Sequence, residues 1–208
     1  MLLLVLTNNT TKTNTQKDKT RANCSMKAEQ TKLEGCFIIH DTIFRDNRGY
    51  FFESFNQQKF ADQTGQNVNF VQDNQSFSSR GVLRGLHLQK GDAAQAKLVR
   101  VITGKVLDVA VDVRKGSATF GQHVAVELTQ DNNTQLFIPR GFAHGFVVLS
   151  ETATFFYKCD NFYNKAADGG IIYNDADISI DWQIEPNELS LSEKDLQLPT
   201  LREFESSL

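Results

Sequence analysis

The chain has 208 residues and a formal net charge of −3 at pH 7. This length fits one domain with a substantial core, and the balance of charge lacks the basic field with which proteins bind a nucleic-acid polymer. Cys24, Cys36 and Cys159 form no C-x-x-C pair, which argues against a disulfide framework or a zinc knuckle and favours a reducing compartment such as the cytoplasm.

Residues 1–25 differ in composition from the rest of the chain. Residues 1–6 are apolar but far too short to span a membrane, and they lack the basic start of a secretory signal. Residues 7–25 are rich in Thr, Asn and Lys and have almost nothing to bury. We predict a disordered N-terminal extension over 1–25, with a degenerate targeting peptide as the alternative, no membrane association, and one domain over 26–208.

Short strands and turns follow one another closely after residue 35. The segments 36–44 and 50–55 are predicted to form a hairpin around a turn at 46–49. Asn56 is predicted to cap a short helix over 57–63 that Gly65 ends. Further strands are predicted at 70–73, 82–89, 97–102, 106–113, 124–128, 136–138, 142–149 and 154–160. This pattern favours an all-β antiparallel sandwich or jelly roll with few short helices.

Two features refine that prediction. In 106–113, four apolar residues alternate with Asp108 and Asp112, which predicts one dry face and one polar face. After Trp182 the composition favours loops, a short helix beginning near Ser192, and a frayed tail.

The stretch 80–89, RGVLRGLHLQ, concentrates unusual residues in one predicted strand. Gly85 interrupts the strand, and strand glycines are typical of bulges or of a close approach by backbone or ligand. His87 is expected on the face opposite Leu86 and Leu88. Taken alone, the stretch favours a satisfied core histidine beside surface arginines, so its role depends on the rest of the chain.

Motif searches exclude several kinds of chemistry. The patterns G-x-G-x-x-G, G-x-x-x-x-G-K-[ST], G-x-S-x-G and H-E-x-x-H are absent. Residues 139–144 follow P-x-G-x-x-H, which resembles the second motif of cupin barrels, but the first cupin motif would fall on LHLQ at 86–89 and lacks its second histidine. His87 and His144 are fewer than the three protein ligands that transition metals usually take, so no metal is predicted.

Five segments, in chain order, resemble the dTDP-4-dehydrorhamnose 3,5-epimerase family: 51–54, 71–74, 82–89, 96–101 and 138–146. The resemblance runs from about residue 26 to residue 198. It implies a cupin jelly roll, usually a homodimer, that inverts C3 and C5 of a dTDP-linked 4-keto-6-deoxyhexose without cofactor or metal.

The resemblance also implies catalytic roles. Both carbons lie next to the C4 ketone, so inversion through an enolate needs a base on one face, an acid on the other, and a stabiliser of charge on the ketone oxygen. His87 matches the base, oriented by Asp195. Tyr157 matches the acid, with an ordinary core tyrosine as the alternative, and Lys97 matches the cation near the C4 oxygen.

The same resemblance implies a set of substrate-binding residues: Arg48, Phe51, Glu53, Gln72, Asp73, Asn74, Arg84, His144, Tyr163, Asp168 and Lys194. The basic members suit a diphosphate, and Phe51 and Tyr163 suit stacking on thymine. The alternatives are solvated surface for Arg48 and Lys194 and a polar turn for 72–74. The chain departs from the family at Asp168 and Arg140, where Glu is commoner.

Several functions stay open at this point. The nearest alternatives are epimerases that invert one carbon only and ketoisomerases of the same superfamily. An inactive sugar-nucleotide binding module is an alternative of another class, and a metal-dependent cupin oxygenase is the least favoured. The sequence does not identify the final sugar or whether it enters a cell-surface polysaccharide.

Overall fold

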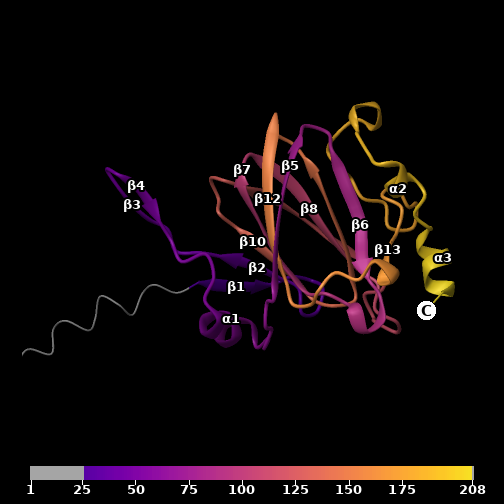
Figure 1. The fold of residues 1–208 in the computed structure, drawn as a ribbon, viewed down its shortest axis with the longest axis horizontal. Coiled ribbons are helices and arrows are strands. Elements are labelled where there is room, and N and C mark those ends of the chain that lie inside the picture. Colours follow the sequence, from indigo (N-terminus) through magenta and orange to yellow (C-terminus); the bar gives the residue numbers. More distant parts are fainter. Residues whose placement is uncertain (1–25, 208) are drawn as a thin grey trace, which may run out of the picture.

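The computed structural model describes residues 26–207, so the predicted disorder of 1–25 lies outside the described residues. The main strands form two antiparallel sheets (Figure 1). The first has the order β1 (Lys27–Gln30), β2 (Phe37–His40), β10 (Gln135–Ile138), β7 (Lys97–Thr103), β12 (Thr152–Cys159) and β5 (Gln72–Ser79). The second has the order β13 (Asp168–Gly170), β6 (Leu83–Gln89), β11 (Phe142–Val148), β8 (Lys105–Asp112) and β9 (His123–Thr129).

The two sheets pack face to face around a buried apolar layer, which confirms the predicted jelly roll. Val99, Leu136 and Phe155 of the six-stranded sheet meet Ala110 and Phe146 of the five-stranded sheet in this layer. Burial of such side chains is the main favourable contribution to folding, at roughly 1.5–3 kcal/mol for each large one. The interior is therefore mainly apolar, with polar side chains at a few places that include a cavity between the sheets.

Further layers cover the outer faces of both sheets. Helix α1 (Gln57–Thr64) buries Phe60 against Phe37, Leu98 and Phe137 of the six-stranded sheet. The C-terminal segment, with α2 (Glu193–Leu196) and α3 (Leu201–Ser206), runs along the five-stranded sheet near β6 (Figure 1). Within residues 26–207, no helix is long and apolar enough to cross a membrane.

The predicted helix is confirmed, and the predicted hairpin is confirmed in part: residues 37–40 of the predicted first strand form β2 in the six-stranded sheet, and the second strand ends at Phe51 rather than at residue 55. Strands β3 (Phe44–Asp46) and β4 (Gly49–Phe51) pair around the predicted turn and extend away from the body of the molecule (Figure 1). Asn56 accepts a hydrogen bond from the Lys59 backbone N–H, and Gly65 ends α1 in the left-handed conformation. Both boundaries follow from the capping preferences of these residue types.

The predicted division of 106–113 into an apolar face and a polar face is present, but both faces of β8 are buried. Its odd-numbered apolar residues pack under the C-terminal segment, while Asp108 and Asp112 are fully buried toward the sandwich. Asp112 accepts hydrogen bonds from Arg114, Ser117 and Thr119. A buried carboxylate requires such hydrogen-bond partners. The alternation in the sequence therefore distinguishes a buried apolar face of the strand from a buried polar face.

Three elements were not predicted. Strand β1 is short and polar, β13 is mostly glycine, and α3 replaces the expected frayed tail. Thr200 and Glu203 form a capping box at α3, whose Leu201 and Phe204 are buried. Strand β5 also extends six residues beyond the predicted 70–73. Pairing with a neighbouring strand or burial against a sheet stabilises each of these elements, and neither is visible in a local pattern.

Gly85 lies at the predicted irregularity of β6, where the register with β11 shifts between His144 and Phe146. Its φ is 132°, and an added Cβ would lie 2.5 Å from the Gly145 Cα. The close neighbour is therefore the backbone of β11 rather than a ligand, and this approach holds His87 and His144 on adjacent strands of one sheet.

We expect Gly85→Ala to lower the free energy of unfolding by about 3 kcal/mol, since backbone strain and overpacking each contribute roughly 1–3 kcal/mol. The matched control is Gly116→Ala, at φ 76° with no atom within 4 Å of the added Cβ, which should cost about 1 kcal/mol. Urea unfolding measures both values. Equal losses in the two variants would contradict the close-approach explanation.

Candidate active site

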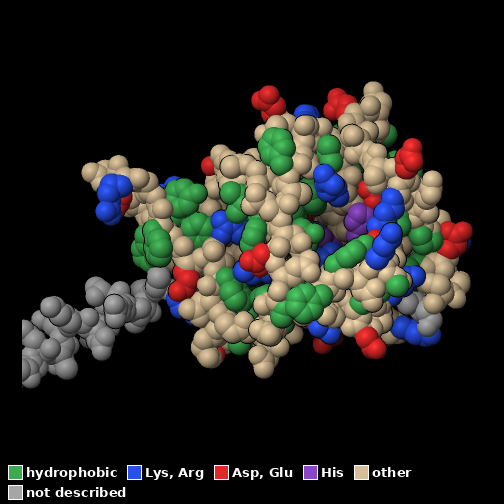
Figure 2. All heavy atoms as spheres, in the orientation of Figure 1, with side chains coloured by type: hydrophobic (Ala, Val, Ile, Leu, Met, Phe, Trp, Pro, Cys, Tyr) green, Lys and Arg blue, Asp and Glu red, His purple; other side chains and the backbone are tan. Residues whose placement is uncertain are grey.

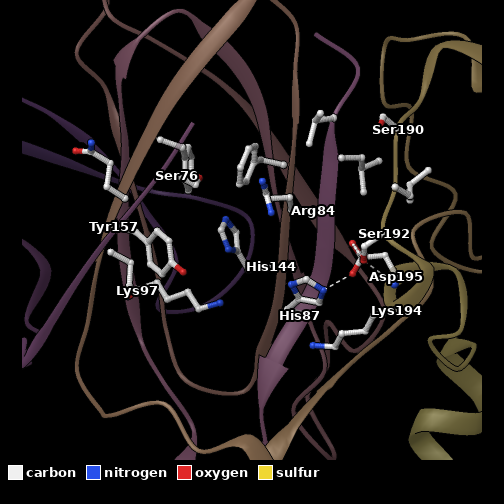
Figure 3. Close-up of a pocket in the computed structure, with 17 residues that line it drawn as sticks. Ser76, Arg84, His87, Lys97, His144, Tyr157, Ser190, Ser192, Lys194 and Asp195 are labelled. Carbon is white, nitrogen blue, oxygen red and sulfur yellow. Dashed lines mark hydrogen bonds and ion pairs between the residues drawn. The ribbon is translucent and has the colours of Figure 1, made fainter. Parts of the chain in front are cut away.

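A cavity of about 600 Å³ lies between the two sheets beside the segment that carries α2 (Figure 3). This volume is typical of a small-ligand site. A second hollow of about 450 Å³ adjoins it and shares five of its lining residues, namely Asn74, His87, Lys97, Tyr157 and Lys194. In Figure 2 a histidine is visible in this recess beside basic side chains.

His87 and Asp195 form a hydrogen-bonded pair at the wall of the cavity. His87 lies on β6, and its Nε2 is 2.5 Å from Oδ1 of Asp195 on α2. As predicted, Leu86 and Leu88 face the opposite side of the strand and are buried. Burial opposes ionisation of Asp195, but hydrogen bonds from His87 and Ser192 outweigh it and hold the pKa of this carboxyl below its usual value. The other ring nitrogen of His87 points into the cavity (Figure 3).

The two members of this pair are brought together by backbone hydrogen bonds. The Leu83 N–H donates to the Ser190 carbonyl (3.0 Å), and the Ser190 N–H donates to the Gly81 carbonyl (2.9 Å). At Gly81 an added Cβ would lie 2.2 Å from the Glu188 carbonyl oxygen. The C-terminal segment is thus attached to the start of β6, four residues before His87.

The six-stranded sheet provides two polar groups to the facing wall. Tyr157 of β12 and Lys97 of β7 both line the cavity, with the Lys97 Nζ 6.0 Å from the centre of the Tyr157 ring. Burial raises the pKa of Tyr157, so its phenol stays protonated at neutral pH. Burial also lowers the pKa of Lys97, partly offset by Cys159 and Asp108.

His144 on β11 also lines the cavity, with its Cα paired in register to that of His87. Its Nε2 is 2.9 Å from Oδ2 of Asp108, and both side chains are buried. Burial lowers the pKa of His144, which keeps the ring neutral. Oδ1 of Asp108 has no hydrogen-bond partner within the described residues. The sequence interpretation included His144 but missed Asp108, whose only local signal was its place in an alternating strand.

Other predicted binding residues line the recess. Arg84 donates to the Ser78 hydroxyl (3.3 Å) and lies at the cavity with Asn74. At the mouth, Asp168 accepts hydrogen bonds from Lys194 (2.5 Å) and Tyr163 (3.2 Å). Burial opposes ionisation of Asp168, but these hydrogen bonds and the charge of Lys194 outweigh it and lower its pKa. This ion pair connects β13 to α2 across the opening.

Gln72 supports the same edge of the recess. Its side-chain oxygen accepts a hydrogen bond from the Tyr163 backbone N–H (3.2 Å), and its amide group donates to Asn74 (3.0 Å). The floor of the cavity includes Phe146 and Phe155, which stack with ring centroids 4.1 Å apart. Neither aromatic residue was among the predicted site residues.

Four predicted binding residues lie away from the cavity within one chain. Arg48 pairs with Asp46 in the projecting hairpin, and Phe51 on β4 is 70% exposed. Glu53 pairs with Lys59. Asp73 pairs with Lys158 and does not line the cavity, whereas its neighbour Asn74 does.

Within residues 26–207, no group of three or more His, Cys, Asp or Glu side chains is arranged to hold a metal ion. The polar side chains of the cavity instead form separate pairs, His87 with Asp195 and His144 with Asp108. This arrangement suits proton transfer better than metal coordination.

The fold and the recess define a jelly-roll protein with a histidine–aspartate pair and a tyrosine on facing sheets of one cavity. The sequence family described as dTDP-4-dehydrorhamnose 3,5-epimerase matches residues 30–203. The enzyme of that name from Escherichia coli (strain K12) is 52% identical over 179 residues, which cover 86% of this chain and 96% of the relative. This chain belongs to the dTDP-4-dehydrorhamnose 3,5-epimerase family.

Solved structures agree with this assignment. The dTDP-4-dehydrorhamnose 3,5-epimerase of Elizabethkingia anophelis NUHP1 superposes with a TM-score of 0.83 at 57% identity, over 86% of this chain and 97% of that chain. The dTDP-6-deoxy-D-glucose-3,5-epimerase of Legionella pneumophila Philadelphia 1, in complex with dTDP-4-keto-L-rhamnose, superposes with a TM-score of 0.84 at 44% identity, over 88% and 96% of the two chains.

The lowered pKa of Lys97 leads to a prediction about stability. The folded protein binds the proton of the Lys97 ammonium group more weakly than the unfolded chain does. Below the pKa of Lys97 in the folded protein, the charged side chain therefore destabilises the fold. This destabilisation decreases as the pH rises from the pKa in the folded protein toward the pKa in the unfolded chain. We expect Lys97→Met to raise the free energy of unfolding at pH 7 by about 1 kcal/mol, and by less at pH 10, while activity is lost.

Urea unfolding at the two pH values tests this expectation, with Lys105→Met as the control, since Lys105 pairs with Glu127 on an exposed part of the sheet. A less stable Lys97→Met protein would mean that attraction to nearby carboxylates exceeds the cost of burying the ammonium group.

Proposed function

We propose that this protein epimerises C3 and C5 of dTDP-4-dehydro-6-deoxy-D-glucose to give dTDP-4-dehydro-L-rhamnose, a step in dTDP-L-rhamnose biosynthesis. The observation that carries the proposal is the placement of His87 and Tyr157 on facing sheets of one cavity, with Lys97 beside the tyrosine. Inversion next to a ketone requires this combination of a base, an acid on the opposite face, and a cation. The names of the relatives support the same reaction.

In the proposed mechanism, the cavity-facing nitrogen of His87 removes the proton from a carbon next to the C4 ketone. The electrons of the C–H bond move onto the C4 oxygen, where the Lys97 ammonium stabilises the enolate. Tyr157 then donates its phenolic proton to the opposite face of the same carbon, which inverts it. Water returns a proton to the phenolate and removes one from the imidazolium, and a second round inverts the other carbon.

The rest of the recess suits the nucleotide. Arg84 and Lys194 flank the cavity and can pair with a diphosphate in the manner of charge-assisted hydrogen bonds. Tyr163 is 55% exposed at the mouth, where its ring is available to stack on thymine. The substrate would displace the Asp168 carboxylate from Lys194 or share the ammonium group with it.

The proposal includes a homodimer. The hairpin presents Phe44, Tyr50 and Phe51 as exposed aromatic side chains far from its own cavity. A two-fold dimer buries such surfaces reciprocally, and a hairpin that projects from one protomer can reach the recess of its partner. In this arrangement Arg48, Phe51 and Glu53 would bind the substrate held by the partner. We also propose a cytoplasmic location, consistent with free Cys36 and Cys159.

The reaction is tested by incubating the protein with dTDP-4-dehydro-6-deoxy-D-glucose in deuterated water. NMR should show deuterium at both C3 and C5, and an NADPH-dependent reductase should convert the product to dTDP-rhamnose. His87→Ala should slow exchange by about 100-fold or more. Tyr157→Phe should retain exchange but lose inversion, because the base remains and the acid does not.

Each rival function predicts a different result in this assay. A single-centre epimerase would leave deuterium at one carbon only, and a ketoisomerase would move the carbonyl group. An inactive binding module would show no exchange in the wild-type protein, and His87→Ala would then change nothing.

The partner-supplied hairpin is tested by complementation. His87→Ala and a Phe51→Ala, Arg48→Ala double variant should each be nearly inactive, but mixing equal amounts under conditions of subunit exchange should restore about a quarter of wild-type activity, since half of the dimers then hold one intact site. Light scattering measures the dimer itself. A mixture no more active than its components would place the hairpin outside the partner's site.

A further inference from the structure

We propose that Ser192 is a positioning residue of the catalytic pair: its hydroxyl proton fixes the Asp195 carboxylate, and the carboxylate in turn fixes His87. The inference deepens the proposed function and rests on it. Neither the sequence motifs nor the predicted site residues included Ser192, which lies at the edge of the cavity next to α2 (Figure 3).

The contacts divide the two carboxylate oxygens between two donors. Oδ1 of Asp195 is 2.5 Å from His87 Nε2, and Oδ2 accepts the Ser192 hydroxyl at 2.9 Å. The Ser192 oxygen in turn accepts the Asp195 backbone N–H at 3.2 Å. A serine hydroxyl has one proton. Because the Asp195 backbone N–H donates to a lone pair of the Ser192 oxygen, the hydroxyl proton is free to point at the Asp195 carboxylate.

This second hydrogen bond matters because a carboxylate turns readily about its last side-chain bond, a torsion with broad preferences. Asp195 is only 3% exposed. The Ser192 hydroxyl therefore supplies the hydrogen bond that water would give to Oδ2 of an exposed carboxylate. With both oxygens held, Oδ1 keeps the proton of His87 on Nε2 and leaves the cavity-facing nitrogen free to act as the base.

The segment that leads to Ser192 is hydrogen-bonded to the start of the strand that carries His87. Ser190, two residues earlier, exchanges backbone hydrogen bonds with Gly81 and Leu83 at the start of β6. The orientation of His87 is thus fixed from both ends, through its own strand and through the chain Ser192, Asp195 and the imidazole.

Ser192 is also the N-cap of α2, and capping is the structural role from which positioning must be separated. A cap needs only an oxygen that accepts the Asp195 N–H, and aspartate caps a helix as well as serine does. Positioning needs a proton to donate, which an ionised aspartate lacks. Threonine can do both, and its extra methyl group has space because Ser192 is exposed.

The test compares three variants in the deuterium-exchange assay at pH 8. We expect Ser192→Ala and Ser192→Asp to lower kcat by about tenfold, as loss of a supporting hydrogen bond at a site commonly does, with KM changed less than about twofold, and Ser192→Thr to retain at least about half of the wild-type rate. Thermal melts confirm that the variants are folded. Full activity in Ser192→Asp would mean that Ser192 acts only as the N-cap of α2, which contradicts the proposal. Full activity in Ser192→Ala would also overturn it.

A second readout needs no substrate. In ¹⁵N NMR of the free wild-type protein, His87 should be protonated at Nε2 with a strongly hydrogen-bonded proton signal. Ser192→Ala and Ser192→Asp should shift or broaden this signal, and Ser192→Thr should preserve it. An unchanged signal in all three would overturn the positioning role. An inactive wild-type protein would instead contradict the proposed reaction, so the two failures are distinguishable.

Discussion

Attachment of the C-terminal segment to the first residues of β6 is the constraint on which the site depends. The backbone of Ser190 pairs with Gly81 and Leu83, which brings two stretches more than a hundred residues apart in sequence into one wall. Without this pairing His87 would face the cavity with no carboxylate behind it. The absence of a side chain at Gly81 is what lets the two backbones meet so closely.

The cavity brings ionisable side chains together where their burial lowers the stability of the folded state. His144 and Asp108 are buried and Lys97 is half-buried, and one oxygen of Asp108 lacks a hydrogen-bond partner among the described residues. Buried ionisable groups of this kind lower stability unless each is fully paired. The dry layer of aliphatic and aromatic residues between the sheets supplies the stability that permits this arrangement.

Local chemistry made some of these features predictable. Asn56 and Gly65 bound α1 because capping depends on neighbouring residues alone, and the alternation around His87 gave the face of its strand correctly. The recognisable segments of the family were enough to predict the jelly roll.

Features set by distant contacts were not predictable in the same way. The alternation placed Asp108 on a polar face of its strand, but periodicity does not reveal that this face is buried against a second layer. Ser192 looked like an ordinary helix start, since its role depends on the position of His87. Strands β1 and β13 carry too few apolar residues to stand out, and only pairing with a neighbour makes them strands.

His87 and Tyr157 belong to different sheets. Their separation is set by the thickness of the apolar layer, where Phe146 of one sheet stacks on Phe155 of the other. These two rings act as a spacer between the walls that carry His87 and Tyr157. Substitutions in this layer, which touch neither residue, can therefore alter the distance between the two side chains across the cavity.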